Sequence, residues 1–149
     1  MRYLAEAVAL LRSSGLSITA ASGVYETEPV ECAPQPPYLN QVLLGAAPVL
    51  ASLFLATCQR VERKLGRTGR GHHSARTLDV DLLFSGGLVV VTPRLILPHP
   101  AIPRRRSILV PLAEVAPQWR HPLLGKSVLE LLAECREPSW VKPLSRTGS

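Results

Sequence analysis

The stretch RTLDVDLLF, Arg76–Phe84, alternates polar and apolar side chains in the manner of a β-strand. Successive side chains of a strand point to opposite faces, so Asp79 and Asp81 would share one face and the apolar residues the other. Two carboxylates side by side repel each other, and aspartate is a poor strand former. The pair therefore indicates a role beyond folding.

The rest of the sequence predicts helices and antiparallel strands around this stretch. Apolar spacing and stop signals predict helices at residues 2–13, 49–66, about 108–115 and about 126–134. Strands are predicted at residues 16–27, 38–47 and 76–84, the first two paired, with a turn at 85–87 leading into a hairpin partner at 88–93. Because hairpins predominate, we expect an α+β fold with a mainly antiparallel sheet and helices packed on one face of it. The chain is expected to form a single domain, residues 1–149, with a polar tail from about residue 136.

Composition and charge narrow the classes of protein. With 149 residues and 46% hydrophobic content, the chain has the composition of a globular domain. No apolar run approaches the roughly 20 residues that span a bilayer, and the three cysteines form no disulfide framework, so we expect a cytoplasmic protein without a membrane partner. The net charge of +6 indicates anionic partners, while an aromatic content of 5% disfavours nucleic acid.

The aspartate pair is a candidate metal site. In a strand the two residues would lie about 7 Å apart, from a rise of roughly 3.2–3.4 Å per residue. Mg²⁺ takes few protein carboxylates and completes its coordination with water and substrate phosphates. Neither His nor Cys stands beside the pair, which argues against zinc or copper. The alternative is an exposed strand face whose carboxylates pair with arginines.

Arginines flank the aspartate stretch on both sides. Arg67, Arg70 and Arg76 precede it or begin it, and the run 104–106 follows the predicted hairpin. The guanidinium fork matches phosphate oxygens, so carboxylates and arginines together indicate Mg²⁺-dependent phosphoryl transfer. For the run 104–106, a solvated basic surface is the alternative.

Two further polar residues are candidates for ligand contacts. His99 stands between Pro98 and Pro100, which restrict its backbone, and could contact a phosphate, although a structural histidine is the alternative. Asn40 lies in a predicted strand, and its amide could read the edge of a planar heterocycle or make a strand-edge hydrogen bond.

Five motifs in this order, YLNQV, ERKLGR, RTLDVDLLF, LILPHP and LVPLAEVAP, resemble the 6-hydroxymethyl-7,8-dihydropterin pyrophosphokinase family of folate biosynthesis. The resemblance implies a ferredoxin-like α+β fold whose first strand, ending in Gly-Ser-Asn, is missing from this chain. It implies a kinase-type transferase that moves pyrophosphate from ATP to 6-hydroxymethyl-7,8-dihydropterin, with two Mg²⁺ ions as cofactors and AMP as product. We expect a monomer.

The resemblance also implies roles for individual residues. The metal ligands would be Asp79 and Asp81, and the catalytic group would be these two with Arg67 and Arg76. The ATP-binding residues would be Gln59, Glu62, Arg67, Arg76, His99 and Arg105. The residues that bind the pterin substrate would be Thr27, Val30, Tyr38 and Asn40.

Two other functions remain open from the sequence. One is a truncated homologue that binds nucleotide with little turnover. The other is a non-catalytic RNA- or nucleotide-binding module on a ferredoxin-like sheet, which would require exposed aromatics on the strands. The aromatic residues on the predicted strands are few, namely Tyr25, Tyr38 and Phe84.

Overall fold

The computed structural model describes residues 2–29, 37–66 and 78–144. Its helices are α1 (Arg2–Ser13), α2 (Ala51–Gly66), α3 (Arg106–Val115) and α4 (Val128–Glu134), with a 3₁₀ turn at Ile102–Arg104. Its strands are β1 (Ser17–Ala21), β2 (Tyr25–Thr27), β3 (Tyr38–Asn40), β4 (Leu43–Ala46), β5 (Val90–Val91), β6 (Ile96–Leu97) and β7 (Val141–Pro143). Every strand pair in this part of the chain is antiparallel, which confirms the predicted α+β class.

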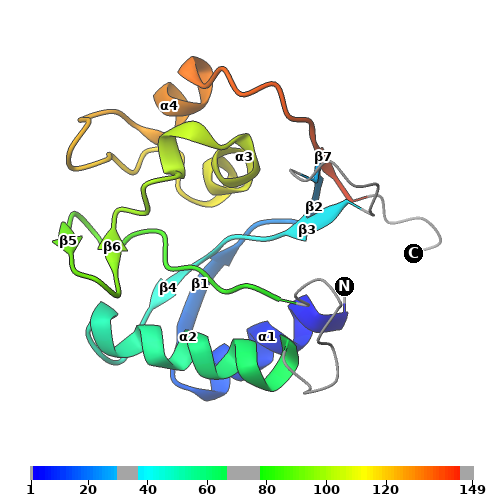
Figure 1. Cartoon of the computed structure of the whole chain (residues 1–149), viewed down its shortest axis with the longest axis vertical. Helices are drawn as coiled ribbons and strands as arrows, with labels where there is room; N and C mark the ends of the chain where they lie inside the picture. The colour runs from blue at the N-terminus through cyan, green and yellow to red at the C-terminus, as the bar shows by residue number, and fades with distance from the viewer. Residues whose placement is uncertain (1, 30–36, 67–77, 145–149) are drawn as a thin grey trace.

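The helices lie on both sides of the strands. Figure 1 shows α1 and α2 side by side beneath β1 and β4, with α3 and α4 on the opposite side. Val42 and Leu43 illustrate the division, because Leu43 packs against the α1–α2 side and Val42 against the α3–α4 side. The prediction that helices would lie on one face only is therefore wrong. None of the helices formed by the described residues is long and apolar enough to cross a bilayer.

The predicted pairing of residues 16–27 with 38–47 is confirmed, but the ribbon is broken into two parts. β1 pairs with β4, and β2 pairs with β3. Between the two parts the buried Ser22 replaces the ladder, because its hydroxyl accepts from the Val42 N–H at 2.9 Å and its carbonyl accepts from the Gln41 side chain at 2.8 Å. These bonds satisfy buried polar groups where the strands bend.

Residues 78–84, the described part of the aspartate stretch, do not form a strand, which corrects the first prediction. Residues 78–84 pair with no strand of the described chain, and a strand exists only through its ladder. Side chains and loops hold the backbone instead: the Val80 N–H donates to Oε2 of Glu62 at 2.6 Å, and the Leu83 carbonyl accepts from the His99 N–H at 2.7 Å. The hairpin in this region is β5–β6, formed further along the chain than predicted.

The segment described from sequence as a polar tail contributes strand β7. This strand pairs antiparallel with β2, so that Val141 lies opposite Thr27. The contact continues past the strand, where the Leu144 N–H donates to the Val24 carbonyl at 2.8 Å. β2 is therefore the central strand of a three-stranded sheet with the order β3-β2-β7.

Two hydrophobic clusters form the core. The first cluster lies between α1, α2 and residues 78–84, which we call the aspartate segment, and consists of Ala7, Leu11, Phe54, Cys58, Val61 and Leu78. The second cluster lies around α3 and α4 and consists of Ile102, Leu109, Leu112, Val128 and Leu131. Leu82 packs on the first cluster and Leu83 on the second, so the aspartate segment passes from one cluster to the other.

Candidate active site

A pocket of about 260 Å³ brings together side chains that are far apart in the sequence. Asp81 reaches it from the aspartate segment, and His99 reaches it from the segment after β6. Its lining residues are Leu55, Val80, Asp81, Leu82, Pro93, Arg94, Leu95, Ile96, His99 and Pro100. Two of the predicted site residues, Asp81 and His99, therefore line one pocket, and the positively charged Arg94 lines it as well.

The aspartate segment keeps the alternation predicted for it even without a ladder. Leu78 is buried, and Val80 packs against the first cluster, whereas Asp79 and Asp81 are exposed. Among the described residues, no three or more His, Cys, Asp or Glu side chains form a group that could hold a metal ion. Two exposed carboxylates fit Mg²⁺, which fills its coordination with water and phosphate oxygens.

Cys58 lies beneath the aspartate segment and is 1% exposed. Burial raises the pKa of its thiol to about 11, and the negative charges of Glu62 and Asp81 act in the same direction. The thiol therefore stays protonated at neutral pH and serves as a small apolar group.

Glu62 and Gln59 are three residues apart on α2, and therefore lie on one side of this helix. Glu62 is partly buried and accepts the Val80 N–H, so it fixes the backbone between the two aspartates. Gln59 is exposed. The sequence assigned both residues to ATP, and the structure gives Glu62 a hydrogen bond to the segment that carries Asp81.

The ring of His99 has a defined orientation. Its Nδ1 accepts a hydrogen bond from the Ala101 N–H at 3.1 Å, and its carbonyl accepts the Ile102 N–H at 3.1 Å. Because Nδ1 is an acceptor, the proton of the neutral ring is on Nε2. The imidazole can therefore offer an N–H donor to an anion.

Arg94 was not predicted as a site residue. It is exposed and lines the pocket with Asp81 and His99. It stands in the turn between β5 and β6, where a single arginine beside a proline gives no distinctive sequence signal. Only the folding of this hairpin toward the aspartate segment identifies it as a possible phosphate contact.

Arg105 lies at the start of α3 and forms an ion pair with Glu137 of the C-terminal segment. Its Nε is 3.5 Å from Oε2 of Glu137, and Oε1 of Glu137 accepts the Arg106 N–H at 2.7 Å. One carboxylate thus bonds the first N–H of α3 and pairs with Arg105, in agreement with the preference for negative charge at a helix start. Arg105 does not line the pocket.

Three of the residues predicted to bind the pterin meet across strands β2 and β3. Thr27 lies opposite Tyr38 in the register, and Asn40 donates through Nδ2 to Oγ1 of Thr27 at 2.7 Å. Thr27 is 2% exposed, so this bond is partly shielded from water and orients the Asn40 amide. The structure therefore brings Thr27 and Asn40 together, while their role in binding the pterin stays a prediction.

The remaining predicted site residues, Val30, Arg67 and Arg76, lie outside the described residues. The same holds for the basic loop at residues 67–75. Their roles stay predictions from the sequence.

Comparison with known proteins gives a consistent result. The family model of 7,8-dihydro-6-hydroxymethylpterin-pyrophosphokinase (HPPK) matches residues 1–117. A Synechocystis "2-amino-4-hydroxy-6-hydroxymethyldihydropteridine pyrophosphokinase" is 38% identical over 101 residues, which cover 68% of this chain and 52% of that protein. A Bacillus subtilis protein of the same name is 36% identical over 117 residues, or 78% of this chain and 70% of that protein.

Some relatives are much longer than this chain. An Arabidopsis thaliana "Folate synthesis bifunctional protein" is 34% identical over 116 residues, which cover 77% of this chain but 24% of that protein. The match therefore spans about half the length of the Synechocystis relative and about a quarter of the Arabidopsis relative.

Proposed function

The chain belongs to the 7,8-dihydro-6-hydroxymethylpterin-pyrophosphokinase family, and on this premise we propose that it transfers pyrophosphate from ATP to 6-hydroxymethyl-7,8-dihydropterin in folate biosynthesis. The new bond would join the pterin hydroxyl oxygen to the β-phosphorus. The bond from this phosphorus to the α,β-bridging oxygen would break, AMP would leave with that oxygen, and the hydroxyl proton would be released. The observation that supports this proposal most is the pocket that Asp81 shares with His99 and Arg94.

The proposal assigns Asp79 and Asp81 to Mg²⁺, with two ions expected alongside ATP. Both carboxylates are exposed, while the apolar residues next to them anchor the segment in the first cluster. When bound, Mg²⁺ would neutralise the charge of the β- and γ-phosphates. The chain's own contribution is to hold the two carboxylates at fixed positions, which Glu62 does through the Val80 N–H.

The ATP phosphates would lie in the pocket beside Asp81. The Nε2 N–H of His99 and the guanidinium of Arg94 are suitable donors to phosphate oxygens. The other residues proposed for ATP are Gln59, Glu62, Arg67, Arg76 and Arg105, and Arg67 and Arg76 belong to the catalytic group. Arg105 would exchange its ion pair with Glu137 for a contact with the nucleotide.

The pterin would bind at the β2–β3 pair. We propose Thr27, Val30, Tyr38 and Asn40 as the residues of this site. The hydrogen bond from Asn40 to Thr27 supports the assignment, because an amide of fixed orientation can distinguish donors from acceptors on the edge of a heterocycle.

The proposal extends to fold and setting. We propose a ferredoxin-like arrangement, a monomer and a cytoplasmic location. The antiparallel pairing of the described strands supports this arrangement. Cys58 and Cys135 are free thiols, which fits a reducing compartment.

The experiment measures AMP formation from ATP, Mg²⁺ and the pterin for the wild type, Asp81→Asn and Glu134→Gln. Asp81→Asn removes a charge from the proposed metal site, and we expect a loss of at least about 100-fold, the size seen when one group that stabilises developing charge is removed. Glu134→Gln is the matched control, because Glu134 pairs with Lys126 on the surface of α4.

AMP formation that survives Asp81→Asn undiminished would contradict the assignment. Wild-type protein that binds ATP yet releases no AMP would instead support the nucleotide-binding homologue with little turnover.

A further inference from the structure

Trp119, in the loop after α3, contacts the last residue of the aspartate segment and the turn that follows it. Its indole ring stacks on Phe84, with centroids 3.9 Å apart and planes inclined by 8°. Its Nε1 donates to the Gly86 carbonyl at 2.9 Å. Trp119 does not line the pocket, so any influence on the site must pass through the segment it holds.

The aspartate segment depends on such contacts because no described strand supports it. On one side the Val80 N–H is held by Glu62, and on the other the Leu83 carbonyl is held by the His99 N–H. Phe84 follows Leu83 directly, and Trp119 fixes the position of its ring. The stack therefore lies directly after the residue whose carbonyl His99 holds.

The turn beyond Phe84 is shaped for the second contact. The Leu88 N–H donates to the Ser85 carbonyl at 2.9 Å, and Gly86 has a φ of +56°. A side chain at this position would be strained in that conformation, which glycine adopts freely. The turn presents the Gly86 carbonyl to the indole N–H of Trp119.

The loop that carries Trp119 is itself well fixed. The buried His121 lies 5.8 Å from the indole, edge to face, and its Nδ1 accepts the N–H groups of Leu123 and Leu124 at 3.2 Å each. The Trp119 carbonyl accepts the Val128 N–H at 3.1 Å, at the start of α4.

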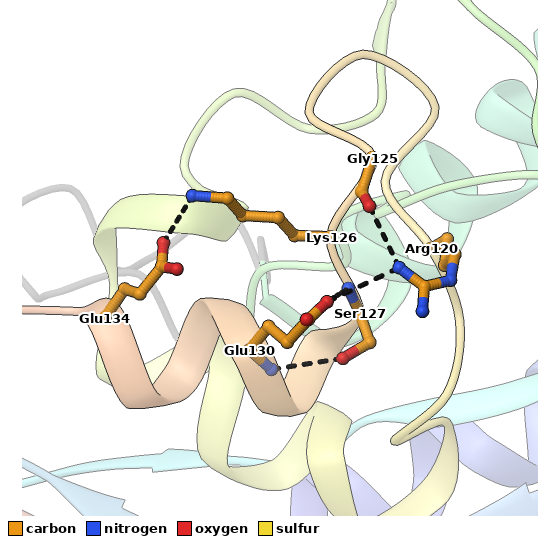
Figure 2. Close-up of polar contacts among 6 residues, drawn as sticks. All are labelled: Arg120, Gly125, Lys126, Ser127, Glu130 and Glu134. Atoms are coloured by element: carbon orange, nitrogen blue, oxygen red, sulfur yellow. Dashed lines mark hydrogen bonds and ion pairs between the residues drawn. The ribbon is translucent and has the colours of Figure 1, made fainter.

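Figure 2 shows the outer bonds of the same loop. Arg120 reaches the Gly125 carbonyl and the Glu130 carboxylate, while Ser127 and Glu130 form the reciprocal capping box of α4. Because these bonds hold the loop, Trp119 can keep the segment that it contacts in a fixed position, which a mobile loop could not do.

We propose that Trp119 is a positioning residue for the metal-binding carboxylates: through Phe84 and Gly86 it holds Asp81 in the geometry that Mg²⁺ and ATP require. This inference rests on the proposed function and deepens it. Its physical basis is that ligands held by a preorganised segment lose less conformational freedom on binding.

The test uses Mn²⁺ as the probe, with ATP present and pterin absent, so that no turnover is needed. Mn²⁺ bound to the protein is measured by equilibrium dialysis, with the same ATP concentration on both sides of the membrane, for the wild type, Trp119→Leu, Trp119→Phe and Trp140→Leu. Trp140 is the matched control, because it lies before β7 and its indole contacts Lys142.

We expect Trp119→Leu to weaken Mn²⁺ binding by about 2- to 12-fold, the equivalent of a stacking energy of about 0.5–1.5 kcal/mol at 1.4 kcal/mol per tenfold. Trp119→Phe keeps an aromatic partner for Phe84 and should recover most of the affinity. The KM for the pterin should stay unchanged in both variants, because the proposed pterin site lies at β2 and β3.

Hydrogen exchange of residues 78–88 in the metal-free protein gives a second readout. We expect faster exchange in Trp119→Leu than in the wild type, and no change in Trp140→Leu. Equal Mn²⁺ affinity in folded wild type and Trp119→Leu would overturn the inference. So would a loss of Mn²⁺ affinity matched by an equal rise in the KM for the pterin, since that pattern indicates general destabilisation.

Failure of the proposed function would look different. The wild type would then release no pterin-dependent AMP, while its Mn²⁺ affinity could still be compared with that of the Trp119 variants. Wild-type protein that binds no Mn²⁺ in the presence of ATP would overturn both proposals.

Discussion

The first and second clusters differ in how their walls are held together. The second cluster is enclosed by α3, α4 and the 3₁₀ turn, which carry their own backbone hydrogen bonds, and α4 begins with a capping box. One wall of the first cluster is instead formed by residues 78–82 of the aspartate segment, whose backbone is held by Glu62 at Val80 and by His99 at Leu83 rather than by a ladder within the described chain. The carboxylates proposed for metal binding therefore stand on the part of the core whose shape depends most on individual side chains.

Truncation of one leucine in each cluster tests this difference with the largest expected effect on stability. Leu109 is 0% exposed within α3, and Leu78 is 7% exposed at the start of the aspartate segment. Leu→Ala substitutions in a core cost about 2–5 kcal/mol in the free energy of unfolding. We expect Leu109→Ala near the upper end, because two helices around it cannot collapse into the cavity, and Leu78→Ala near the lower end. Urea unfolding measures both.

The same pair should separate stability from function. Leu78→Ala should reduce AMP formation more than its loss of stability explains, because it loosens the segment that carries Asp79 and Asp81. Leu109→Ala should retain activity as long as it is folded. A larger loss of stability in Leu78→Ala than in Leu109→Ala would contradict the stated difference between the clusters.

The pH dependence of stability that arises from His121 is a smaller expected effect. Burial lowers the pKa of its imidazole below the ordinary value of 6.5. The unfolded chain therefore binds a proton at this residue more readily than the folded chain, so the contribution of His121 to stability is fully present above about pH 6.5 and is lost as pH falls through the folded pKa. We expect the urea concentration at the unfolding midpoint to decrease when the pH is lowered from about 7.5 to about 5.5.

His121→Asn tests the origin of this pH dependence. Its side-chain oxygen can still accept the loop N–H groups that Nδ1 accepts, but it does not titrate. The variant should therefore show a smaller fall in midpoint than the wild type over the same pH range. An identical fall in both proteins would assign the pH dependence to other groups.

The sequence predicted those parts of the fold that depend on local contacts. The helix at 2–13 has the predicted bounds, and α2, α3 and α4 begin within two residues of the predicted positions, because helical periodicity records contacts between residues three and four apart. Residues 78–84 have a strand pattern but form no strand with the described chain, since a ladder requires a partner that periodicity alone does not supply. β7 has three residues and ends in Pro143, which is too short to leave a pattern.

The candidate site divides in the same way. Asp81 and His99 could be selected from residue chemistry and from the resemblance, and the structure brings them to one pocket. The sequence could not predict that Arg94 would line the pocket or that Glu62 would bond to Val80. Both contacts arise because segments that are distant in the sequence approach each other in the fold. The partner of Arg105, Glu137, lies 32 positions further along the chain and has no motif to mark it.

Phosphorus NMR of the reaction products tests the central claim most directly. The wild-type protein is mixed with ATP, Mg²⁺ and 6-hydroxymethyl-7,8-dihydropterin, and the products are identified as the ATP signals decay. The proposed reaction predicts AMP and the pterin diphosphate in equal amounts, with no ADP. ADP formed together with a pterin monophosphate, or ATP that remains intact in the presence of folded protein, would contradict it.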